Sequence, residues 1–312
     1  MNRKRVLFAD SALLGITFVW GTTFIVVQNT LAKLPPLSFN AWRFLTAAIL
    51  LLLWQVFLSK KKKDNVKLFS NQLVVTGFIL GIFLFIGYIC QTIGLLYTSA
   101  SNAAFITGLS VVLVPIFSAL LLRKRPPIQA IIGIILATCG LFFLTTKGSF
   151  SLNRGDLIVF ICAVAFALQI VFTEKYTLQF SSLPLTVIQL GTVAILSFIF
   201  SGIIDGAKLF DWQTLLMPDV IIVILFMGLV ATAAAFLLQT ILQKETPATH
   251  VGIIYIMEPV FAALTSLAFQ HMVLGFSELC GCLLILAGML LAEWPMNRSR
   301  LEAKPAKLKK RS

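Results

Sequence analysis

The chain has few charged residues, and acids are especially scarce. Charged residues make up 12% of the 312 positions, and only 12 residues are Asp or Glu, whereas a soluble domain carries about 25% charged residues. Hydrophobic residues make up 59%, and the mean hydropathy is +0.96. A fold in water has no means of burying so much apolar surface. The composition therefore excludes a soluble globular protein and requires a membrane as the solvent.

The sequence motifs that mark enzymes and metal sites are also absent. The two histidines, His250 and His271, stand at the ends of apolar runs, and there is no HExxH, nucleophile elbow or phosphate-binding loop. All five cysteines lie inside apolar runs, and Cys280-x-Cys282 has neither the second cysteine pair nor the histidines of a zinc site. We therefore expect no enzyme activity, no cofactor and no metal.

Ten apolar runs are long enough to cross a bilayer, which takes about 20 residues each. The first run follows three basic residues but is too long for the core of a signal peptide, so we expect it to remain as a span. The gaps between runs leave no room for an extramembrane domain. The expected spans are 9–29, 37–58, 73–96, 101–122, 128–146, 156–175, 184–204, 219–243, 248–270 and 274–294.

The basic residues are confined to the gaps between spans. An even number of spans places both termini on one side, and if that side is cytoplasmic, 20 Lys and Arg residues fall inside and four fall outside. This asymmetry is the positive-inside rule. It predicts cytoplasmic termini, at 1–8 and in the basic tail 295–312. The net charge of +13 is thereby explained without a nucleic-acid partner.

The two halves of the chain resemble each other at an offset of 146 to 148 residues. Asp10 opens the first span as Asp156 opens the sixth, and Arg43 in the second span aligns with Gln189 in the seventh. Three further pairs fit the same offset: Gln91 with Gln239, Gly133 with Gly281, and Gly140 with Gly288. The repeats are 9–146 and 156–294. Because each contains five spans, the second enters the membrane from the opposite face.

An inverted repeat suggests a mechanism. Two similar halves related by an axis in the membrane plane can exchange conformations, which opens one central site to each side in turn. The alternative is a duplicated static scaffold. Two prolines deep within spans, Pro115 and Pro259, are expected to bend their helices beside a cavity. Their positions match only loosely between the repeats, and a kink that merely improves packing is the other interpretation.

Glu258 is the strongest candidate for a functional residue. It lies near the middle of the ninth span, where a carboxylate costs a few kcal/mol on insertion scales, so it must be protonated, paired or in contact with water. A helix through Val251 and Ala262 places Tyr255 on the same face as Glu258. The pair predicts contact with a substrate or a coupling proton. A protonated carboxyl that only stabilises the Pro259 kink is the alternative.

Other polar residues in the spans are candidates for substrate contact. Arg43 lies near the outer end of the second span, where it can either snorkel to the interface or attract an anion. Gln91, Gln239 and Asn102 either join helices or line the cavity. Trp20 of the first span is a candidate for the transport pathway. The expected cavity lies between the first, third, fourth, sixth, eighth and ninth spans.

These residues belong to motifs that resemble the EamA-like ten-helix carriers of the drug/metabolite transporter superfamily. The resemblance covers 9–294 and rests on four motifs: Val19-Trp20-Gly21-Thr22-Thr23-Phe24, Trp42-Arg43-Phe44-Leu45-Thr46-Ala47-Ala48, Thr98 to Leu109 with Val114-Pro115, and Met257-Glu258-Pro259-Val260-Phe261-Ala262-Ala263-Leu264. It implies a bacterial inner-membrane carrier that exports amino acids, metabolites or drug-like compounds through a central cavity. It also implies that Trp20, Arg43, Glu258 and Pro259 occupy recurrent positions of the family.

The chain departs from the family pattern at one loop. Many members carry Gly-Glu-Arg after the fourth span, where this sequence has Arg123-Lys124-Arg125. If that acidic residue contributes to gating, the loop itself cannot supply it here.

The sequence therefore predicts an all-α polytopic membrane protein of ten transmembrane helices in two inverted five-helix EamA repeats. We expect a secondary transporter of a small-molecule substrate, surrounded by membrane lipids, with a homodimer compatible with its small-residue helix faces. Two rival functions are a lipid or lipid-linked-sugar translocator and a non-transporting sensor or partner protein.

Overall fold

A computed structural model describes residues 3–62, 70–94, 96–98, 100–124, 126–146, 153–270 and 275–293. Every regular element in these ranges is a helix, as predicted. The elements are α1 (Arg3–Leu31), α2 (Pro36–Lys62), α3 (Asn71–Gly94), α4 (Ala100–Gly108), α5 (Ser110–Leu121), α6 (Ile128–Thr146), α7 (Arg154–Thr177), α8 (Ser182–Ile204), η1 (Gly206–Phe210), α9 (Trp212–Leu215), α10 (Pro218–Phe226), η2 (Met227–Ala234), α11 (Ala235–Leu242), α12 (Ala248–Tyr255), α13 (Glu258–Gln270) and α14 (Phe276–Glu293).

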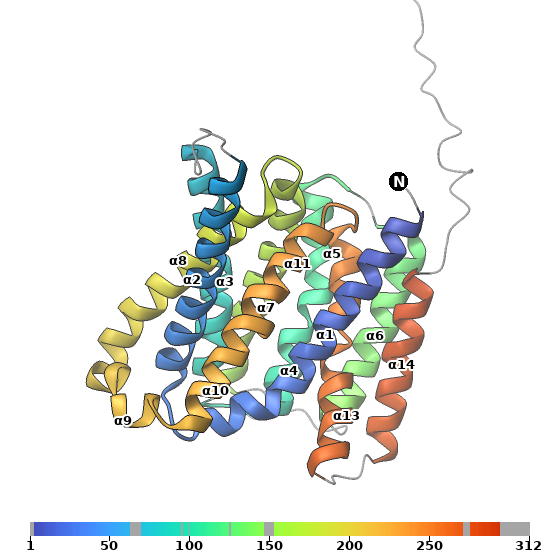
Figure 1. The fold of residues 1–312 in the computed structure, drawn as a ribbon. Helices are drawn as coiled ribbons and strands as arrows, with labels where there is room; N and C mark the ends of the chain where they lie inside the picture. The colour runs from blue at the N-terminus through green and yellow to red at the C-terminus, as the bar shows by residue number, and fades with distance from the viewer. Residues whose placement is uncertain are drawn as a thin grey trace, which may run out of the picture.

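These elements form rods that pass side by side through one bundle (Figure 1). In the described ranges, six helical stretches are long and apolar enough to cross a membrane, and four shorter apolar helices accompany them. The fourth rod consists of α4 and α5, the eighth of α10, η2 and α11, and the ninth of α12 and α13. The rods fall where the ten spans were predicted.

Two hydrogen bonds between the repeats mark the ends of the bundle. The Thr246 hydroxyl donates to the Asp10 carboxylate at 2.8 Å, and the Thr98 hydroxyl donates to the Asp156 carboxylate at 2.5 Å. We name the two ends after these acids, and α1 begins at the Asp10 end, which is uppermost in Figure 1. Asp10 and Asp156 are equivalent positions of the repeat, as are Thr98 and Thr246. The two halves are therefore joined in the same way at opposite ends.

Helices α6 and α14 cross at four glycines. A Cβ on Gly133 would lie 2.5 Å from the carbonyl oxygen of Gly288, and a Cβ on Gly140 would lie 2.6 Å from that of Gly281. The lower-numbered glycine of each helix thus meets the higher-numbered glycine of the other, so the helices are antiparallel. Gly133 is the repeat equivalent of Gly281, and Gly140 that of Gly288. An inverted repeat requires this crossed pairing.

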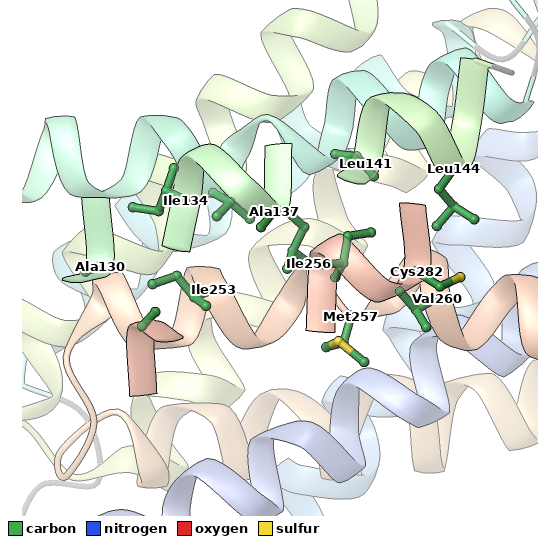
Figure 2. Close-up of a cluster of buried hydrophobic side chains, with 13 residues drawn as sticks. Ala130, Ile134, Ala137, Leu141, Leu144, Ile253, Ile256, Met257, Val260 and Cys282 are labelled. Carbon is green, nitrogen blue, oxygen red and sulfur yellow. The ribbon is translucent and has the colours of Figure 1, made fainter. Parts of the chain in front are cut away.

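The fourth and ninth rods are interrupted at equivalent places. Leu109 separates α4 from α5 with φ −63° and ψ −14°, and Ile256 ends α12 with φ −65° and ψ −13°. These positions are separated by the repeat offset. Figure 2 shows the second interruption from within the core, where Ile256 and Met257 pack with Ile134, Ala137 and Leu141 of α6. The interruption is therefore enclosed by protein, as backbone at membrane depth must be.

The interruption of the fourth rod does not lie at its proline. Helix α5 contains Pro115, and the interruption lies at Leu109, six residues earlier. There the Leu109 N–H is shared between the carbonyls of Phe105 and Ile106, and Val112 N–H closes a tight turn on the Leu109 carbonyl. This tightening follows Gly108, a poor helix former. Pro259 is the second residue of α13, where its missing N–H is tolerated. The bends expected at Pro115 and Pro259 remain predictions.

The glycine crossing generates a prediction about stability. Gly140→Ala should lower the melting temperature by several degrees, because overpacking a close helix contact costs about 1–3 kcal/mol. Gly191→Ala in α8 is the matched control, since a Cβ there meets nothing within 4 Å and alanine is the better helix former. Thermal denaturation of both variants in detergent measures the difference. Equal melting temperatures would contradict the close crossing.

Candidate functional site

The centre of the bundle is organised by a π-helix, η2, in the eighth rod. The Ala231 carbonyl of this π-helix accepts hydrogen bonds from side chains of two other rods. Trp20 of α1 donates its indole N–H to this carbonyl at 2.8 Å, and Arg43 of α2 approaches it with Nη2 at 3.5 Å. Arg43 also donates Nε–H to the Thr232 hydroxyl at 2.6 Å. Three rods therefore meet at two residues of η2.

Arg43 points into the protein and away from the membrane interface. Its side chain is 5% exposed. The close approach of α2 to η2 depends on Gly228, where a Cβ would lie 3.2 Å from the Arg43 carbonyl oxygen. The snorkelling interpretation of Arg43 does not fit this geometry, because hydrogen bonds to η2 hold the guanidinium inside the bundle.

Aromatic rings surround the Arg43 guanidinium. Its central carbon lies 5.2 Å from the centre of the Tyr88 ring of α3, a distance typical of a cation–π contact. Trp20 contacts the Tyr255 ring at 5.1 Å and the Phe236 ring at 5.4 Å between centroids. The centre thus offers one fixed positive charge within apolar aromatic walls.

Glu258 brings a carboxyl group to the same centre. It is the first residue of α13, directly after the interruption, and it is only partly buried. The carboxyl lies within electrostatic range of Arg43 and of the Tyr88 and Tyr255 phenols. Arg43 and Glu258 form no direct ion pair in the described part of the chain. The Tyr255 hydroxyl is buried and has no hydrogen-bond partner there.

The amide residues that were predicted to join helices or line the cavity lie in different parts of the bundle. Gln91 of α3 is half-buried and donates to the Thr107 hydroxyl of α4 at 3.4 Å. Its repeat equivalent, Gln239, is 1% exposed and donates at 3.3 Å to both Gln169 of α7 and Gln243 of α11. Gln239 therefore joins helices near the Asp10 end instead of contributing to the central cluster. The side chain of Asn102 lies outside the described residues.

Several residues of the centre were not predicted. Tyr88 was identifiable in principle, because it precedes Gln91 by three residues and so shares its helix face. Thr232 had no such signal, since a threonine in an apolar run resembles any packing residue. Gln189, the repeat equivalent of Arg43, is fully buried, and neither its amide nitrogen nor its amide oxygen has a partner in the described ranges. Polar atoms without partners at membrane depth are expected where a ligand or water binds.

Two clefts lie towards the ends of the bundle instead of its centre. One, of about 160 Å³, is lined by Trp42, Trp212 and the apolar side chains of α10 at the Asp156 end. The other, of about 430 Å³, is lined by Asn71, Gln72 and Gln179 among others, at the Asp10 end. Within the described ranges, no three His, Cys, Asp or Glu side chains are grouped so as to hold a metal.

Comparison with known proteins is consistent with this arrangement. An "Uncharacterized transporter" of Archaeoglobus fulgidus is 33% identical over 285 residues, which cover 91% of this chain and 85% of the relative. The "Uncharacterized transporter YyaM" of Bacillus subtilis is 28% identical over 290 residues, covering 90% and 92%. The "Uncharacterized inner membrane transporter YedA" of Escherichia coli is 26% identical over 211 residues, covering 67% and 66%.

A solved structure shares the fold, and a family model matches each half of the chain. A solved crystal structure superposes with a TM-score of 0.73 at 17% identity, covering 94% of this chain and 99% of the other, and at that identity it shows the fold alone. The EamA-like transporter family model matches twice, at residues 7–146 and 153–294. The two matches coincide with the two halves related by the crossed glycines. The chain is thus a multi-pass membrane protein that belongs to the EamA-like transporter family.

Proposed function

We propose that this protein is a secondary transporter that moves a small organic solute across the bacterial cytoplasmic membrane by alternating access, in the direction of export. The observation that carries the proposal is the centre of the bundle, where the buried Arg43 and the partly buried Glu258 lie within electrostatic range of each other without a direct ion pair in the described part of the chain. A charged residue at membrane depth costs free energy that a static scaffold has no reason to incur. A solute that contacts both groups offsets that cost.

The two repeats support alternating access. Equivalent residues form equivalent bonds at the two ends, and the interruptions of the fourth and ninth rods lie at equivalent positions. Two halves of similar structure can exchange conformations around a fixed centre. The excess of basic residues at the Asp10 end supports cytoplasmic termini, and the printed name of the Escherichia coli relative supports an inner-membrane location.

Flux into proteoliposomes tests the proposal directly. The purified protein is supplied with labelled amino acids, nucleobases, polyamines and a lipophilic cation, with and without an imposed pH gradient. Saturable flux of one class is the expected result. Absence of flux for every solute, from protein shown to be folded, would reject the proposal. Translocation of a labelled lipid in the same vesicles would favour a lipid translocator instead.

Glu258→Gln should abolish flux or its response to a pH gradient while the protein remains folded. Glutamine keeps the size and hydrogen-bonding capacity of the side chain but can neither carry a charge nor exchange a proton. Asp211→Asn is the matched control, since Asp211 is an exposed cap of α9 far from the centre. Flux with unchanged pH response in Glu258→Gln would exclude Glu258 from coupling and binding.

Arg43→Lys should raise the KM for the transported solute by about tenfold, which corresponds to the loss of one charge-assisted hydrogen bond. Lysine retains the charge but lacks the planar guanidinium that contacts Thr232 and Tyr88 together. The control is Arg154→Lys, because Arg154 is exposed at the start of α7. Concentration-dependent flux measures KM and the maximal rate separately. An unchanged KM would show that Arg43 has only a structural role.

A further inference from the structure

Within the described ranges, the packing of the two ends differs around Glu174, near the C-terminal end of α7. Glu174 is 4% exposed, and its carboxylate accepts a hydrogen bond at 2.9 Å from the backbone N–H of Ala248, the first residue of α12. The other carboxylate oxygen binds Lys124, which follows α5. One buried acid therefore joins the sixth, ninth and fourth rods at the Asp10 end.

A set of amide bonds extends this closure towards the centre. The Gln239 amide donates to Gln169, and the Gln243 amide donates to the Ile170 carbonyl at 3.1 Å. Each of these bonds joins α11 to α7. Gln169 in turn donates to the hydroxyl of Thr173, the residue directly before Glu174. Together with Glu174, these residues hold α7, α11 and α12 together at the Asp10 end, and we call them the Glu174 cluster.

The Asp156 end has no equivalent closure within the described ranges. The repeat equivalents of α7 and α12 are α1 and α4, and these two helices are not closely packed, whereas α7 and α12 are. Gln91, the equivalent of Gln239, is half-buried and bonds Thr107 of α4, whereas Gln239 bonds Gln169 of α7. The two ends therefore differ in their closure although both carry the same Asp–Thr bond.

We propose that the Glu174 cluster is the gate at the Asp10 end, closed in this structure, and that it must separate when the transporter opens towards that side. The bonds present at both ends, Asp10 to Thr246 and Asp156 to Thr98, are then common to all states, because they do not depend on which end is closed. The close packing of α7 against α12, which the equivalent helices α1 and α4 do not share, is then the contact that changes. This inference rests on the proposed alternating access, and by the orientation argued above the gate faces the cytoplasm.

Thiol labelling tests the gate without knowledge of the solute. In a background lacking the five native cysteines, Val251→Cys reports on the gate, because Val251 lies one turn inside Ala248 and is fully buried. Gln91→Cys reports on the Asp156 end. Each reporter is treated with N-ethylmaleimide in nanodiscs. In the parent protein we expect slow labelling of the Val251 reporter and fast labelling of the Gln91 reporter.

Glu174→Gln should reverse this preference. Glutamine still accepts from the Ala248 N–H but loses the charge that binds Lys124, so the closed state is weakened by about tenfold or more. Labelling of the Val251 reporter should accelerate accordingly while labelling of the Gln91 reporter slows. Lys124→Gln removes the same ion pair through its exposed partner and should change labelling in the same direction. This second variant keeps the proposal testable if Glu174→Gln does not fold.

The control is Asp219→Asn, which breaks the exposed ion pair between Lys33 and Asp219 at the opposite end and should leave the Val251 reporter unchanged. Unaltered labelling in both gate variants would overturn the proposal. Acceleration at both reporters would also overturn it, because general loosening acts on both ends alike whereas a gate acts on them in opposite directions. A reciprocal shift without flux of any solute would retain the gate and reject the proposed function.

Discussion

Backbone hydrogen bonding at membrane depth is the constraint on which this structure depends. Lipid offers no partners, so a helix can be interrupted only where protein encloses the interruption. Leu109, the Ile256–Met257 step and the π-helix η2 are three departures from regular α-helix within the rods. The Ile256–Met257 step lies in the packed interior, and η2 supplies the Ala231 carbonyl that binds Trp20 and Arg43. Irregular backbone and polar side chains therefore occur together at η2, because the backbone supplies a carbonyl acceptor and the side chains supply N–H donors.

The same constraint explains why small residues and short polar bonds occur where the repeats meet. In lipid, association of helices gains little from the hydrophobic effect, so close packing and hydrogen bonds must provide it. The crossed glycines of α6 and α14 permit backbone contact, and Gly228 does the same between α2 and η2. Such contacts have few alternative geometries. They fix how the halves meet.

Much of this architecture was predictable from the sequence, because hydropathy reports directly on membrane spans. The ten spans and the repeat were identified from length, charge and the residues shared at a fixed offset. Arg43, Glu258, Tyr255 and Trp20 do converge, since a polar group at membrane depth has little choice but to face the interior. Gln239 shows the limit of this reasoning, because the sequence indicates that an amide is buried but not which neighbour satisfies it.

Other features were beyond prediction for a physical reason. The fourth-rod interruption lies at Leu109, whose N–H is shared between two carbonyls, and not at the nearby proline, which lies within α5. The π-helix has no signature in the apolar run that forms it. Glu174 lies at the end of a span beside Lys175, where a charge is ordinary, and only tertiary structure shows that it is buried against Ala248 and Lys124.

The partners of the buried charges distinguish their roles. Asp156 accepts bonds from Thr98 and from the backbone N–H of Asn153, so it is fully used in joining and capping helices. Glu174 is neutralised by Lys124 and by the N-terminus of α12, whose dipole favours an anion. Arg43 differs, because its hydrogen bonds go to a hydroxyl and a carbonyl, and both are neutral. A positive charge that the surrounding protein solvates but does not neutralise retains its attraction for an anionic group, which is the property that a binding site for a charged solute requires.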